Sequence, residues 1–160
     1  MTLSSSWNPL VSNSANLCFP EASFESATVV CRTNRDEFDN PRKIKDSPFK
    51  RYVDLWMLSL IIGRSARIFL PSAPQKKFID GKIFQGDLPR ISIILSIVYL
   101  HEGKDPSVIQ SASSILSIAN AYVAGGLPLV LESMESSSSS SIENLFKSLS
   151  EGEIVSENFL

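Results

Sequence analysis

The chain has 160 residues, of which 43% are hydrophobic and 20% are charged, and its formal net charge is −2. This composition is typical of a globular protein of single-domain size and excludes an intrinsically disordered chain. No uninterrupted apolar run reaches the roughly 18 residues that a membrane-spanning helix needs. We therefore expect no membrane partner.

The N-terminal region lacks the marks of an exported protein, because residues 1–31 contain neither Lys nor Arg. A signal peptide needs a basic start before its apolar stretch. Cys18 and Cys31 are the only cysteines, and their spacing fits neither a zinc pattern nor a disulfide framework. We expect two reduced thiols, no metal ion, no cofactor and a cytoplasmic location.

The first elements in chain order are an arm and a helix. Residues 1–48 are expected to form an irregular arm with one short strand over residues 27–32, where β-branched residues gather. Polar residues before Pro48 predict a helix start there, and Gly63 is the expected stop. Residues 64–70 are expected to form a short strand or an extended segment. The apolar residues of this helix recur at helical spacing, at Phe49, Val53, Trp56 and Leu60.

The middle of the chain predicts a hairpin and more helices. Residues 78–84 (FIDGKIF) place Asp-Gly between apolar flanks, which predicts a β-hairpin. Asp87 is the expected cap of a second helix that ends at residues 102–103. A third helix is expected from Asp105–Pro106 to Gly125–Gly126, and a short fourth one over residues 127–134. The predicted fold class is therefore mainly α, a compact helical core domain over residues 49–135 with a minor β-hairpin or short strands.

The C-terminal part begins with six serines, residues 136–141, which predict a flexible linker. Residues 142–160 are then expected to hold an amphipathic helix and a tail, because Ser140 and Glu143 have capping-box spacing. This helix either binds a groove of a partner protein or folds back on its own core, and the sequence leaves both open. Its apolar, candidate partner-binding residues are Ile142, Leu145, Phe146 and Leu149.

Positive charge gathers just before and at the start of the first helix. Such clusters bind nucleic-acid phosphates by releasing counterions, and aromatic residues among them can stack on bases. Acidic residues are interspersed here, which favours a solvated loop instead. The candidate nucleic-acid-binding residues are Arg32, Arg35, Arg42, Lys43, Lys45, Lys50 and Arg51.

Catalytic patterns are weak in this sequence. Glu102 and Lys104, with Asp87 fifteen residues upstream, match part of a metal-dependent nuclease pattern. That site needs a strand before Glu102, whereas the apolar residues there have helical spacing. His101, the only histidine, has no nucleophile beside it in sequence, and no phosphate-binding glycine motif is present. We expect no catalytic residue.

Three segments, PFKRYVDLW at residues 48–56, FIDGKIF at 78–84 and IANAYVAGGL at 118–127, carry a family resemblance. In this order they resemble small uncharacterised proteins encoded beside bacterial DNA-modification and anti-phage systems, including phosphorothioation clusters. The resemblance covers residues 48–134, and its motifs are structural, so no active-site residue carries over. It implies an accessory subunit that works with DNA-acting partners.

Three function classes follow from the sequence. The leading hypothesis is a non-enzymatic interaction subunit of a multi-protein assembly, because the helices and the arm are unusually apolar. Other protein subunits are its expected partners, and a homo-oligomer is left open. The first alternative is a DNA- or RNA-binding protein that uses residues 32–51. The second alternative is a metal-dependent nuclease that uses Asp87, Glu102 and Lys104.

Overall fold

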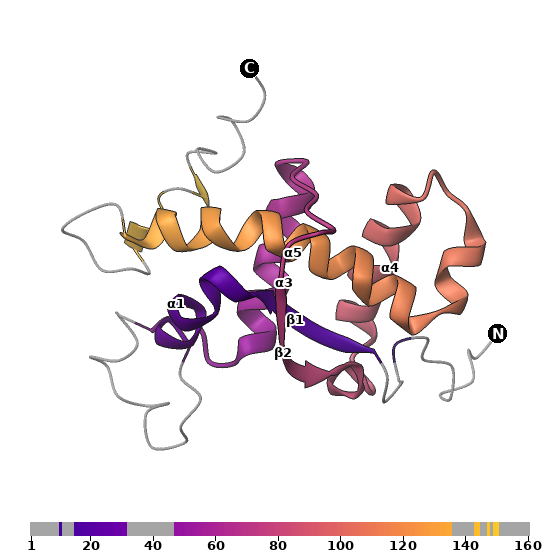
Figure 1. Cartoon of the computed structure of the whole chain (residues 1–160), viewed down its shortest axis with the longest axis horizontal. Helices are drawn as coiled ribbons and strands as arrows, with labels where there is room; N and C mark the ends of the chain where they lie inside the picture. Colours follow the sequence, from indigo (N-terminus) through magenta and orange to yellow (C-terminus); the bar gives the residue numbers. More distant parts are fainter. Residues whose placement is uncertain are drawn as a thin grey trace. The chain divides into compact units, whose positions relative to one another are not determined.

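A computed structural model shows a mainly helical chain, which confirms the predicted fold class (Figure 1). The structure describes Leu10, residues 15–31 and 47–135, and Glu143, Asn144, Lys147, Leu149 and Ser150. Its contacts divide the chain into two compact units. Unit 1 consists of Met1–Cys18 and Lys77–Asn120, and unit 2 consists of Phe19–Lys76 and Ala121–Leu160. The sequence-based boundaries at residues 48 and 135 stay predictions.

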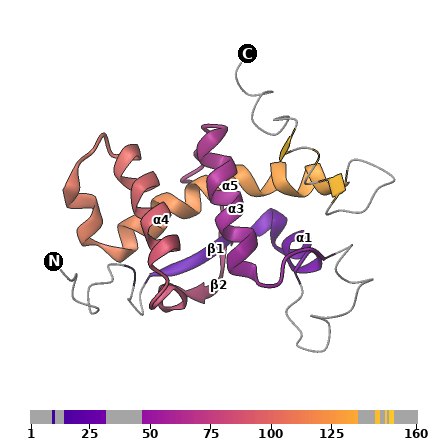
Figure 2. The ribbon, with the colours of Figure 1, turned by 180° about the vertical axis from the view of Figure 1, so that it is seen from behind.

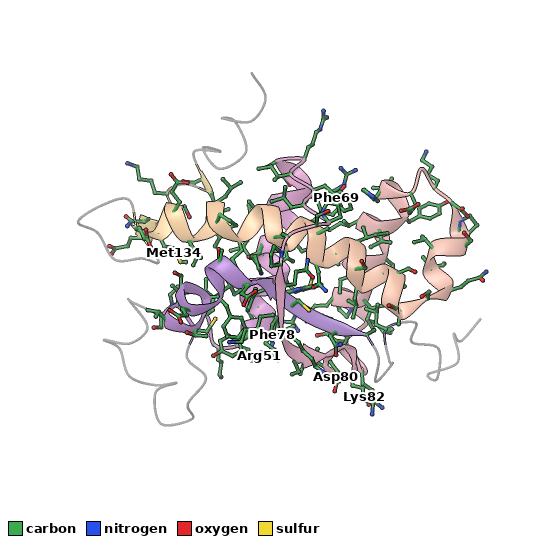
Figure 3. The ribbon with its side chains drawn as sticks, in the orientation of Figure 1. Arg51, Phe69, Phe78, Asp80, Lys82 and Met134 are labelled. Carbon is green, nitrogen blue, oxygen red and sulfur yellow. The ribbon has the colours of Figure 1, made fainter. Side chains whose placement is uncertain are left out.

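A two-stranded antiparallel sheet is formed by β1 (Asn16–Pro20) and β2 (Gln75–Asp80). The backbone N–H of Gly81 donates to the carbonyl of Ala15 at 2.8 Å, beside one end of the pair. The strands are far apart in sequence, so the predicted hairpin over residues 78–84 is wrong. β2 instead runs into a 3₁₀ turn, η3 (Gly81–Phe84), where the Asp80 carboxylate accepts a hydrogen bond from the Lys82 N–H at 3.1 Å (Figure 3).

Gly81 is required by a close approach and not by a hairpin turn. A Cβ atom at this position would lie 2.4 Å from the Leu10 carbonyl oxygen, within unit 1. Real Cβ atoms do not approach a backbone oxygen that closely, so only glycine fits. The Asp-Gly pair therefore caps a 3₁₀ turn and admits a neighbouring backbone.

Unit 1 is built around α4 (Leu88–His101), which contacts η3 and a second 3₁₀ turn, η4 (Pro106–Gln110). The predicted cap is confirmed, since an Asp87 carboxylate oxygen accepts a hydrogen bond from the Arg90 N–H at 3.3 Å. Asp87 also forms an ion pair with the Arg90 guanidinium. The buried side of α4 is aliphatic and consists of Ile91, Ile94, Ile97 and Val98.

Unit 2 contains α1 (Phe24–Val29), which contacts α3 (Tyr52–Ser65). The predicted strand over residues 27–32 is wrong, because α1 covers residues 27–29 and Cys31 makes only an isolated β-bridge, while Arg32 lies outside the described residues. The Thr28 hydroxyl donates to the Glu25 carbonyl at 2.6 Å, so this β-branched residue is satisfied inside a helical turn. Trp56 of α3 is fully buried. The ring of Phe19 meets Phe24 and Tyr52 edge-on, with centroids 6.4 and 6.3 Å apart.

Both predicted ends of the first helix are wrong. The helix begins at Tyr52 because Phe49 forms a parallel bridge with Cys31, which removes residues 48–50 from the helix. The Ser47 hydroxyl donates to the Val29 carbonyl at 2.6 Å instead of capping the helix. Helix α3 passes Gly63 and ends at Ser65. Arg67, with φ of 58°, supplies the left-handed residue that follows many helix ends.

The predicted third and fourth helices are one helix, α5 (Ala112–Glu135), which is unbroken in both views (Figure 1 and Figure 2). Gly125 and Gly126 do not stop it, because both are buried against neighbouring backbone of unit 2. Its beginning is also later than predicted: Asp105–Pro106 starts η4, and α5 follows at Ala112.

Helix α5 is long and apolar enough to cross a membrane by length and composition alone. However, 72% of the relevant window is buried inside the protein. A core helix of a soluble protein has the same properties, so the absence of a membrane partner stays a prediction.

Candidate functional site

The predicted nuclease residues lie at opposite ends of one helix. Asp87 caps the start of α4, whereas Glu102 follows its last residue. At a rise of about 1.5 Å per residue, their backbones are separated by roughly 22 Å. One metal ion cannot bridge that distance, so these residues do not form a shared metal site. In the part of the chain that the structure describes, no three His, Cys, Asp or Glu side chains are grouped to hold a metal ion.

Most of the predicted nucleic-acid-binding residues lie outside the described residues, namely Arg32, Arg35, Arg42, Lys43 and Lys45. Lys50 and Arg51 are described, and both are exposed. The guanidinium of Arg51 contacts both carboxylate oxygens of Asp54, at 2.8 and 3.1 Å. This ion pair offsets the charge of Arg51 and leaves less of it to attract a phosphate.

Neither thiol is activated as a nucleophile. Burial, with a smaller effect of the Asp54 charge, raises the pKa of Cys31 to about 12. Burial also raises the pKa of Cys18, although the positive charge of Lys77 opposes the effect. Because the thiolate is the reactive form, both thiols are less reactive at neutral pH than an ordinary cysteine.

The side chain of His101 lies near a carboxylate, with its Nε2 atom 3.9 Å from Glu102 Oε1.

A shallow depression in unit 1 has a volume of about 540 Å³. Its walls carry serine hydroxyls from η4 and from the first turns of α5, together with one carboxylate and two aliphatic side chains. These groups can hydrogen-bond a polar molecule, but the lining includes no histidine or lysine, the side chains that usually activate a serine. The lining residues are Glu102, Ser107, Val108, Ser113, Ser114, Ser117 and Ile118.

The clearest surface feature is one side of α4, which we call the α4 outer face. It carries four of the nine large hydrophobic side chains that are exposed among the described residues. Leu88 is 64% exposed, Leu100 52%, Ile93 40% and Tyr99 37%. All seven members of this face are exposed, namely Leu88, Pro89, Ser92, Ile93, Ser96, Tyr99 and Leu100.

The α4 outer face is uncharged, and its two serines are already satisfied. The Ser92 hydroxyl donates to the Leu88 carbonyl at 2.8 Å, and the Ser96 hydroxyl donates to the Ser92 carbonyl at 2.7 Å. Both bonds lie within the helix, so covering these serines leaves no unpaired donor. The face therefore offers methyl, methylene and ring groups to a neighbour at little desolvation cost.

Sequence reasoning missed this face because the apolar residues before Glu102 predict a helix without showing which of its sides the core covers. An available signal was the complete lack of charge between residues 91 and 100. If a helix carries no charge on any side and other elements do not surround it completely, its exposed face is uncharged. This holds whichever of its sides is buried.

The predicted C-terminal partner-binding residues are only partly described. Ile142, Leu145 and Phe146 lie outside the described residues, and Leu149 is 41% exposed. Asn144 is buried, and its side-chain N–H donates to the carbonyl of Met134 at 3.2 Å, near the end of α5 (Figure 3). The Asn144 side chain thus pairs with a carbonyl near the helix end, where backbone carbonyls lack partners within the helix.

Comparisons of this chain with protein-family models, with curated proteins and with solved structures found no match.

Proposed function

We propose that this chain is a non-enzymatic interaction subunit that binds protein through the α4 outer face. The observation that carries the proposal is the concentration of exposed apolar side chains on one uncharged helix face. Scattered exposed apolar residues are ordinary, whereas a contiguous group of them marks an interaction surface. The cores of protein interfaces are likewise depleted of charged residues.

The energetics favour covering this face. Burying a leucine side chain fully contributes about 1.5–3 kcal/mol relative to leaving it in water. Leu88 and Leu100 are more than half exposed, so most of that contribution is still available to a partner. The serines between them add no penalty because their hydroxyls are bonded within the helix.

The wider setting of the proposal comes from the sequence resemblance. We place the subunit in the cytoplasm, in a bacterial DNA-modification or defence assembly, because residues 48–134 resemble accessory proteins of such systems. Direct nucleic-acid binding through residues 32–51 is the alternative. The ion pair between Arg51 and Asp54 weighs against it at the one basic residue whose partner is described.

The test compares two isoleucine-to-lysine variants in an affinity purification from the native cell. Ile93→Lys places a charge on the α4 outer face. Ile61→Lys is the matched control, because Ile61 is also 40% exposed and lies inside the helix α3. We expect Ile93→Lys to lose co-purifying protein that the unchanged chain and Ile61→Lys retain. Equal recovery with both variants contradicts the proposal, and recovery of nucleic acid alone favours the alternative.

A further inference from the structure

We draw no further inference here: the strongest candidate, the shallow depression lined by serines of η4 and of the first turns of α5, carries none because all of its lining side chains are exposed or half-buried, so nothing in the structure points to one class of ligand.

Discussion

Replacing Gly126 with alanine tests how closely α3 and α5 approach each other in unit 2. The added Cβ atom would lie 1.9 Å from the carbonyl oxygen of Ser59 and 2.5 Å from the backbone nitrogen of Gly63. Both neighbours are backbone atoms of a helix, so neither can move aside as a flexible side chain does. The two helices must separate to admit one methyl group.

The expected size of the effect comes from two opposing contributions. Overpacking a core costs up to about 3 kcal/mol in ordinary cases. Alanine is more favourable than glycine inside a helix by about 1 kcal/mol. The net loss in the free energy of unfolding is therefore about 2 kcal/mol, which lowers the Tm of a chain of this size by about 4–8 °C.

Thermal and urea denaturation followed by circular dichroism measure this loss. Glu132→Ala is the control, because Glu132 is exposed on the same helix, and its effect should stay within about 0.5 kcal/mol. Gly63→Ala should resemble Gly126→Ala, since a Cβ at Gly63 would lie 2.0 Å from the Tyr122 carbonyl oxygen. The double variant should lose less than the sum, because the helices separate only once. A neutral or stabilising Gly126→Ala refutes the close approach.

Three further results are expected. Asn120→Ala should lower the free energy of unfolding in urea by about 2–4 kcal/mol, because it leaves two β1 backbone groups unpaired; an unchanged midpoint contradicts this role. In a Cys18→Ser variant, a thiol reagent at pH 8 should modify Cys31 far more slowly in the folded chain than in the unfolded chain. The reason is that a pKa of about 12 keeps the Cys31 thiol protonated until the solution is strongly alkaline. Equal rates in the two states contradict the burial of Cys31. If nucleic acid binds directly, neutralising three basic residues should reduce the slope of log affinity against log salt by about 2.7, and unchanged binding rules the alternative out. Those residues are Arg42, Lys43 and Lys45.

The sequence predicted the fold correctly where a side chain forms a hydrogen bond with the backbone a few residues away. Asp87 caps α4 as expected, because the cap bond needs only a short polar side chain at that position. The mainly helical class followed from apolar spacing in the same way. These features depend on residues close together in the chain, so one sequence contains the necessary information.

Elements decided by distant contacts were mispredicted. Gly125 and Gly126 have the local character of a helix stop, yet their missing side chains admit Ile68 and Ser59. The glycines serve helix packing, and α5 continues through them and through Pro128. Gly81 was mispredicted for the same reason, since a neighbouring backbone requires it. A single sequence does not show which segment will lie against a glycine.

The candidate site was missed for a related reason. The sequence of α4 is apolar almost all round, so its pattern does not show which side the core covers. Ile94 and Ile93 are neighbours of identical chemistry, yet one is fully buried and the other is 40% exposed. The elements that pack against α4, η3 and η4 among them, decide which of the two is covered.

The division of the chain into two units has a consequence for any attempt to dissect it. The chain passes from one unit to the other within β1, within β2 and within α5. Neither unit is one continuous stretch of sequence, so no single cut releases either of them whole. A truncation that removes the end of α5 takes residues from unit 2, and it also shortens the helix whose first turns belong to unit 1. Gene fragments, split reporters and domain transplants are therefore unsuitable for this protein, and point substitutions in the intact chain are the means of assigning its functions to its parts.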